Sequence, residues 1–146
     1  MNENEQGLVK QITNFFNRLP RFKIVLIKTY SRDADYYKRL SEELCYKFIN
    51  LQEECKSKQI KIEELSGYTQ LRDILKGYSD NMGDVVFAEI DLLLSVLERS
   101  KRMRFFETIL NTQFSNNVVI PVSVFYQEIP EVENLYNSGL IIKEER

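Results

Sequence analysis

The 146-residue sequence predicts an α/β fold with three layers and a mostly parallel sheet. Apolar residues stand in unbroken runs at 24–27, 85–88 and 118–120. Such runs are typical of strands that are covered on both faces. Between them lie stretches in which apolar residues recur every three or four positions, as in amphipathic helices. Buried strands that alternate with such helices indicate a parallel sheet between two helical layers.

The predicted elements begin with a helix at 4–19, which ends at Pro20 because proline cannot continue a helix. A strand at 22–28 follows, and Asp33 or Ser31 can cap the next helix with a side-chain oxygen. The later elements, in chain order, are a helix at about 34–48, a short strand at 48–51, a helix over 68–78 that ends between Gly77 and Gly83, a strand at 84–89, helical pieces at 92–97 and about 102–114, a strand at 117–125 and a short strand at 140–142.

The chain is expected to form one α/β domain over residues 1–146, with a leading helix within 1–20 and an acidic tail at 126–146. No element is predicted for residues 52–63, which are polar and charged. Pro121 has no backbone N–H, which favours a sheet edge or a strand end near residue 120.

Composition excludes several classes of protein and site. The sequence contains no histidine, which removes Ser-His-Asp and Cys-His catalysis and histidine-ligated zinc. A net charge of −2 is not the strongly positive charge expected of a domain that binds nucleic acid on its own. The apolar run near 90–97 is interrupted by Asp91 and Ser95 and is too short to cross a bilayer. The expectation is therefore that nucleic acid is contacted only indirectly and a membrane not at all.

The two cysteines, Cys45 and Cys55, match no zinc or CxxC pattern. Cys45 falls in an apolar helical pattern and is expected to be buried. Unpaired cysteines indicate a reducing, cytoplasmic location.

The order of strands and helices is the skeleton of a P-loop NTPase. In that fold a glycine-rich loop after the first strand cradles phosphates, and an acid after a later strand orients Mg²⁺. The strand 85–89 ends in Glu89 and is like a Walker B strand, a weak pattern because apolar strands often end in an acid. The loop at 28–35, called the first loop below, contains no glycine. Ala34 and Asp35 stand where a Walker A motif has its lysine and hydroxyl residue, so phosphate binding is disfavoured.

The layout resembles the small P-loop protein family of BrxF, from type III BREX phage-defence systems. The resemblance covers roughly residues 22–125 and rests on the strand segments 22–27, 48–51, 85–94 and 118–122 and on the helix 37–44. It implies the P-loop-like fold, with Glu89 in the Walker B acid position, and a role as a small subunit of a defence or mobile-element complex. It does not carry over nucleotide activity, because the first loop lacks the family's glycines and lysine.

No cofactor is expected. If a nucleotide or another anion binds, the candidate residues are Lys28, Thr29, Arg32 and Glu89. If a metal binds, the candidates are Glu89 and Asp91. The tyrosines that flank the first loop, at 30, 36 and 37, can stack on bases, although such rings are more often buried.

A basic cluster at residues 99–104 is the predicted protein-binding surface. Its members are Arg99, Lys101, Arg102 and Arg104. Helical periodicity turns Phe106 and Met103 inward and leaves Phe105 toward a flank, so Phe105 is predicted at the centre of an exposed patch with a cationic rim. The alternative is that this helix has a buried face wide enough to include the rings of both Phe105 and Phe106.

Three hypotheses of function follow. The first is a non-catalytic P-loop-like interaction subunit of a larger bacterial protein complex of the anti-phage defence type. The second is a weak nucleotide- or nucleic-acid-binding protein that uses the first loop and the basic cluster. The third is a small acid-metal, nuclease-like enzyme built on Arg32, Asp33, Asp35 and Glu89. The missing glycines and histidines favour the first hypothesis and disfavour an enzyme.

Overall fold

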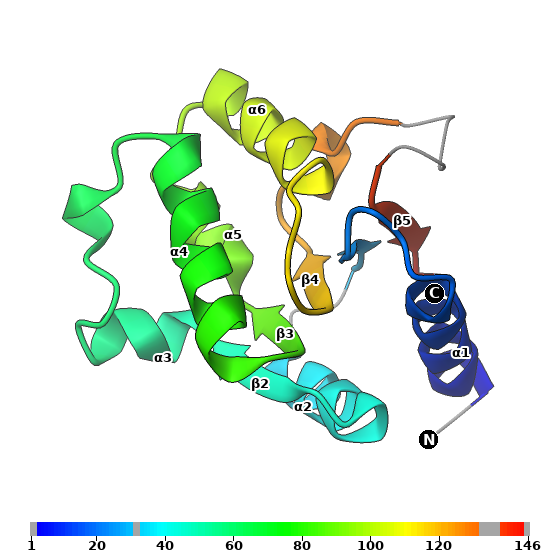
Figure 1. Ribbon diagram of the computed structural model, residues 1–146. Helices are drawn as coiled ribbons and strands as arrows, with labels where there is room; N and C mark the ends of the chain where they lie inside the picture. The colour runs from blue at the N-terminus through cyan, green and yellow to red at the C-terminus, as the bar shows by residue number, and fades with distance from the viewer. Residues whose placement is uncertain (1–2, 31–32, 132–137, 145–146) are drawn as a thin grey trace.

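The computed structural model describes residues 3–30, 33–131 and 138–144 (Figure 1). The elements are α1 (Glu3–Asn17), β1 (Ile24–Lys28), α2 (Ala34–Leu44), β2 (Lys47–Asn50), α3 (Leu51–Lys56), η1 (Ile62–Glu64), α4 (Tyr68–Met82), β3 (Val85–Ala88), α5 (Ile90–Leu94), α6 (Arg99–Leu110), β4 (Val118–Val122), η2 (Tyr126–Glu128) and β5 (Leu140–Lys143). The five strands form one parallel sheet in the order β2-β3-β4-β1-β5.

Helices cover both faces of the sheet, which confirms the predicted three-layer α/β fold. Alternate residues of β1 face opposite layers. Val25 and Ile27 pack with α1 and α2, whereas Ile24 and Leu26 pack with the layer of α3, α4, α5 and α6. Because every β1 position from 24 to 27 is fully buried, the strand reads as an apolar run rather than an alternation.

Several boundaries differ from the sequence prediction for local reasons. Helix α3 was not predicted, because its stretch carries little apolar periodicity; the Asn50 side chain starts it by accepting from the amides of Gln52 and Glu53. Helix α2 ends at Cys45, which adopts a left-handed conformation (φ 61°) and releases the chain into β2. Cys45 is therefore exposed, and the expectation that it is buried was wrong.

Pro121 lies within β4, an interior strand, so the expectation of a sheet edge was wrong. Pro121 is nevertheless close to the end of β4 at Val122, and a strand end near residue 120 was the other expectation. The Val122 carbonyl accepts from the amide of Thr29, the residue after β1, so the backbone of the preceding residue, Pro121, faces the β3 side. The β3–β4 register stops at Val86 and Val119. The missing N–H of Pro121 therefore removes no hydrogen bond from the ladder.

The predicted final strand is confirmed as β5, which pairs with β1 at the edge of the sheet. Gly139 precedes it and donates its N–H to the Leu110 carbonyl of α6 at 2.8 Å. A Cβ at residue 139 would lie 2.2 Å from Ile24 Cγ2 and 2.7 Å from the Ile24 carbonyl oxygen. The start of β5 therefore requires glycine because of close backbone approach.

Gly139→Ala is expected to lower the free energy of unfolding by about 1–3 kcal/mol, because the added methyl group must push β5 away from β1. Urea denaturation followed by circular dichroism measures the loss. Gly77→Ala on α4 is the matched control, since a Cβ there meets nothing within 4 Å and alanine favours a helix. Equal stability of the Gly139→Ala variant and the original chain would contradict the packing described.

In the described part of the chain, no helix combines the length and the hydropathy that crossing a membrane requires.

Candidate functional site

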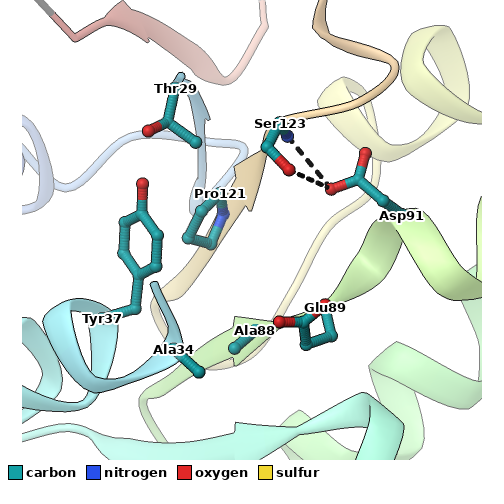
Figure 2. Close-up of a pocket in the computed structure, with 8 residues that line it drawn as sticks. All are labelled: Thr29, Ala34, Tyr37, Ala88, Glu89, Asp91, Pro121 and Ser123. Atoms are coloured by element: carbon teal, nitrogen blue, oxygen red, sulfur yellow. Dashed lines mark hydrogen bonds between the residues drawn. The ribbon is translucent and has the colours of Figure 1, made fainter. Parts of the chain in front are cut away.

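A small pocket lies at the carboxyl ends of β1, β3 and β4, the edge of a parallel sheet where α/β proteins bind ligands (Figure 2). Its lining residues are Thr29, Ala34, Tyr37, Ala88, Glu89, Asp91, Pro121 and Ser123. The pocket volume is about 20 Å³, which is room for about one water molecule. A nucleotide does not fit this space.

The first loop is organised around its own side chains. Asp33 caps α2 by accepting the Asp35 amide at 3.0 Å, so a carboxylate of the chain already takes one of the free amides at this helix start. Ala34 lines the pocket where a Walker A lysine would stand. Of the candidate anion ligands, Lys28 ends β1 with a half-buried side chain and Arg32 lies outside the described residues.

Thr29 is 1% exposed, and its hydroxyl points toward the end of β5. There the Glu144 carboxylate accepts from Thr29 Oγ1 at 2.5 Å, from the Tyr36 hydroxyl at 2.6 Å and from the Tyr37 hydroxyl at 3.3 Å. The Glu144 amide donates to the Lys28 carbonyl. One acidic residue from the end of the chain thus joins β5, β1 and α2.

The two tyrosines at this contact stay protonated. Burial raises the pKa of Tyr36 well above its usual value, and the hydrogen bond and charge of Glu144 raise it further. Burial is also the largest cause of the raised pKa of Tyr37; a hydrogen bond with Thr29 opposes it. Both hydroxyls therefore remain hydrogen-bond donors at physiological pH.

Asp91, a candidate metal ligand, is 6% exposed and its oxygens are engaged by the turn after β4. Oδ2 accepts from the amide and the hydroxyl of Ser123, both at 3.0 Å (Figure 2). Oδ1 accepts from the amides of Val124 and Phe125, at 3.0 and 3.1 Å. Four donors satisfy this carboxylate, so its evident role is to fasten α5 to the end of β4.

Glu89, the candidate Walker B acid, follows β3 and lines the pocket. Its backbone is left-handed (φ 68°), an uncommon conformation for a residue with a Cβ, and it stands at the N-cap position of α5 without a capping hydrogen bond from its side chain. The structure brings Glu89 and Asp91 to one pocket, as their spacing in the sequence suggests. Within the described residues there is no group of three or more acidic, cysteine or histidine side chains that could hold a metal.

The basic cluster lies in the first half of α6, and its side chains differ in their contacts and exposure. Arg102 is paired with Glu128 through Nε at 2.7 Å and Nη2 at 2.9 Å, donates to the Leu97 carbonyl, and lies over the Phe125 ring at 4.2 Å. Arg99 and Arg104 are exposed, and so is Lys101, which reaches the Ser66 carbonyl at 3.1 Å. Arg102 is therefore structural. Arg99 also lies 3.9 Å from Glu128, but its side chain and those of Lys101 and Arg104 are exposed at the surface.

Phe105 is fully buried, which corrects the expectation of an exposed aromatic patch. Its ring meets that of Phe106 edge to face, with centroids 5.6 Å apart. Met103, expected inward, is 40% exposed. Helix α6 packs against α4, η2 and β1, and this wide contact buries both phenylalanines. The alternative of a wide buried face is confirmed.

Sequence reasoning missed Glu144 and Ser123. Glu144 was one acid among several in the tail, and its hydrogen-bond partners Thr29, Tyr36 and Tyr37 lie more than 100 residues away. A signal was nevertheless present, because Glu144 lies two residues after the predicted strand 140–142 and so stands at the same sheet edge as the first loop.

The chain matches no protein-family model, no curated protein and no solved structure.

Proposed function

We propose that this protein is a non-catalytic, P-loop-like interaction subunit of a larger bacterial protein complex of the anti-phage defence type. The observation that carries the proposal is the occupied carboxyl-end edge of the sheet. At the same edge of the sheet at which a P-loop protein holds phosphates, and next to the first loop, this chain places Glu144 against Thr29, Tyr36 and Tyr37. A carboxylate at this place repels a phosphate group and takes up its hydrogen-bond donors.

The rest of the pocket supports a non-catalytic role. Among the described residues, its lining includes the acids Glu89 and Asp91 but no lysine or arginine, so no described lining side chain neutralises the charge of a triphosphate. The volume of about 20 Å³ admits about one water molecule. The fold of a nucleotide-binding protein without the means to bind nucleotide fits a structural subunit, and the resemblance to BrxF suggests the defence setting.

The surface proposed for the partner is the exposed part of the basic cluster: Arg99, Lys101 and Arg104. All three side chains are exposed near the start of α6, and Met103 and Val96, 40% and 44% exposed, lie on and next to that helix. Cations beside exposed apolar side chains are a common composition of protein interfaces. The expected partner therefore presents an acidic surface.

The test is affinity capture with a triple charge reversal. We expect Arg99→Glu, Lys101→Glu and Arg104→Glu together to reduce recovery of the partner at least about tenfold, because like charges oppose docking. The matched control reverses Lys10, Lys38 and Lys47, which are exposed on α1, α2 and β2. The proposal fails if both triple variants recover the same partners equally well, or if the original chain is recovered alone under native conditions.

One contact favours the alternative of weak nucleic-acid binding. The Tyr30 ring of the first loop lies 5.5 Å from Tyr126 of η2, and Glu128 of the same short helix holds Arg102. The first loop and the basic cluster thus adjoin one another across η2. Fluorescence anisotropy with a labelled single strand separates this alternative from the proposal: binding that weakens steeply with salt and is lost in the Arg99/Lys101/Arg104 variant would favour it.

A further inference from the structure

The Glu144 carboxylate accepts hydrogen bonds from three hydroxyl groups that belong to the packed part of the fold. Thr29 and Tyr37 are 1% and 3% exposed, so their hydroxyls are fixed by the surrounding core. The rings of Tyr36 and Tyr37 pack edge to face, with centroids 4.8 Å apart, and Arg39 lies over the Tyr36 ring at 5.9 Å. Three hydroxyl groups, from the residue after β1 and from α2, therefore converge on one carboxylate.

The chemistry of this site selects for a single negative charge. All three donors are neutral hydroxyls. Among the described side chains, none of the ion pairs involves Glu144. Hydroxyls donate well to a carboxylate, but they do not neutralise the two or three charges of a phosphate.

We propose that Thr29, Tyr36 and Tyr37 form a monocarboxylate-binding site that Glu144 fills as an internal latch, and that a free carboxylate binds there when Glu144 is removed. The latch holds the end of β5 on β1, where the Glu144 amide donates to the Lys28 carbonyl at 2.9 Å. This inference does not depend on the proposed interaction role, since it concerns one carboxylate and its three donors.

Glu144→Ala with added acetate tests the site, because this substitution removes the atoms of one acetate ion. We expect the variant to have a lower melting temperature than the original chain. Acetate should then restore about 2–4 °C in a saturable manner. Sodium chloride and inorganic phosphate at equal ionic strength should not. The original chain, whose site is filled, should show no acetate-specific rise.

Two control variants make the result specific. Glu131→Ala removes an exposed acid elsewhere and should show no acetate response. Adding Tyr36→Phe to Glu144→Ala removes one donor and should weaken the rescue. The proposal is overturned if acetate has no effect on Glu144→Ala, if phosphate acts as strongly as acetate, or if the response survives Tyr36→Phe unchanged.

A second measurement serves if Glu144→Ala does not fold. Glu144→Gln keeps the side-chain volume and one acceptor oxygen but loses the charge. In NMR spectra of the protein with ¹³Cζ-labelled tyrosine at neutral pH, this variant should shift the signals of Tyr36 and Tyr37. Those of Tyr46 and Tyr78, which bond Asn117 and Glu54 instead, should stay in place. Unchanged signals of both Tyr36 and Tyr37 would overturn the latch.

Discussion

Asp91→Ala is expected to lower the free energy of unfolding by about 3–5 kcal/mol, because it leaves three backbone amides and one hydroxyl after β4 without their acceptor. The carboxylate is 6% exposed and receives all four hydrogen bonds itself. At about 2–4 °C per kcal/mol, the melting temperature should fall by roughly 6–20 °C. Urea denaturation followed by circular dichroism measures the free energy.

Two further variants serve as comparisons for Asp91→Ala. Asp91→Asn keeps Oδ1 as an acceptor for Val124 and Phe125 but loses the acceptor for Ser123, so an intermediate loss is expected. Asp80→Ala removes an exposed acid of α4 and should change stability by no more than about 0.5 kcal/mol. If Asp91→Ala were as mild as Asp80→Ala, Asp91 would not be the fastening between α5 and β4, and a ligand-binding role would return.

Phe105→Ala should be comparably damaging, with a loss of about 3–5 kcal/mol, because a fully buried ring leaves a cavity between α6 and its neighbours. The matched control is Met103→Ala on the same helix, where a side chain 40% exposed should cost less than about 1 kcal/mol. Denaturant midpoints of the two variants give the comparison. A Phe105→Ala protein as stable as Met103→Ala would place the ring at the surface, as periodicity alone suggested.

Helical periodicity predicted that α6 exists but not how wide its buried face is. That width depends on how many neighbours the helix has, and α6 contacts α4, η2 and β1 together. With a single neighbour, one of the adjacent rings Phe105 and Phe106 would face solvent. The strands were easier to predict, because burial on both faces leaves unbroken apolar runs in the sequence itself.

The acids of the site show a second limit. The spacing of Glu89 and Asp91 after β3 correctly indicates that both reach the carboxyl-end pocket. It does not show that the turn at 123–125 takes up both Asp91 oxygens, because those amides come from the segment after β4, about 30 residues further along the chain. Glu144 is harder still, since its partners Thr29 and Tyr36 become neighbours only when β5 pairs with β1.

The most direct test of a closed, non-catalytic carboxyl-end site is titration of the intact chain with Mg-ATP in an isothermal calorimeter. The account predicts no binding heat at concentrations up to about 1 mM, which corresponds to a binding free energy weaker than about −4 kcal/mol. ATP hydrolysis should likewise stay at background. A micromolar dissociation constant for Mg-ATP would contradict the account, because it would require the Glu144 carboxylate to leave Thr29, Tyr36 and Tyr37 and the first loop to accept phosphates.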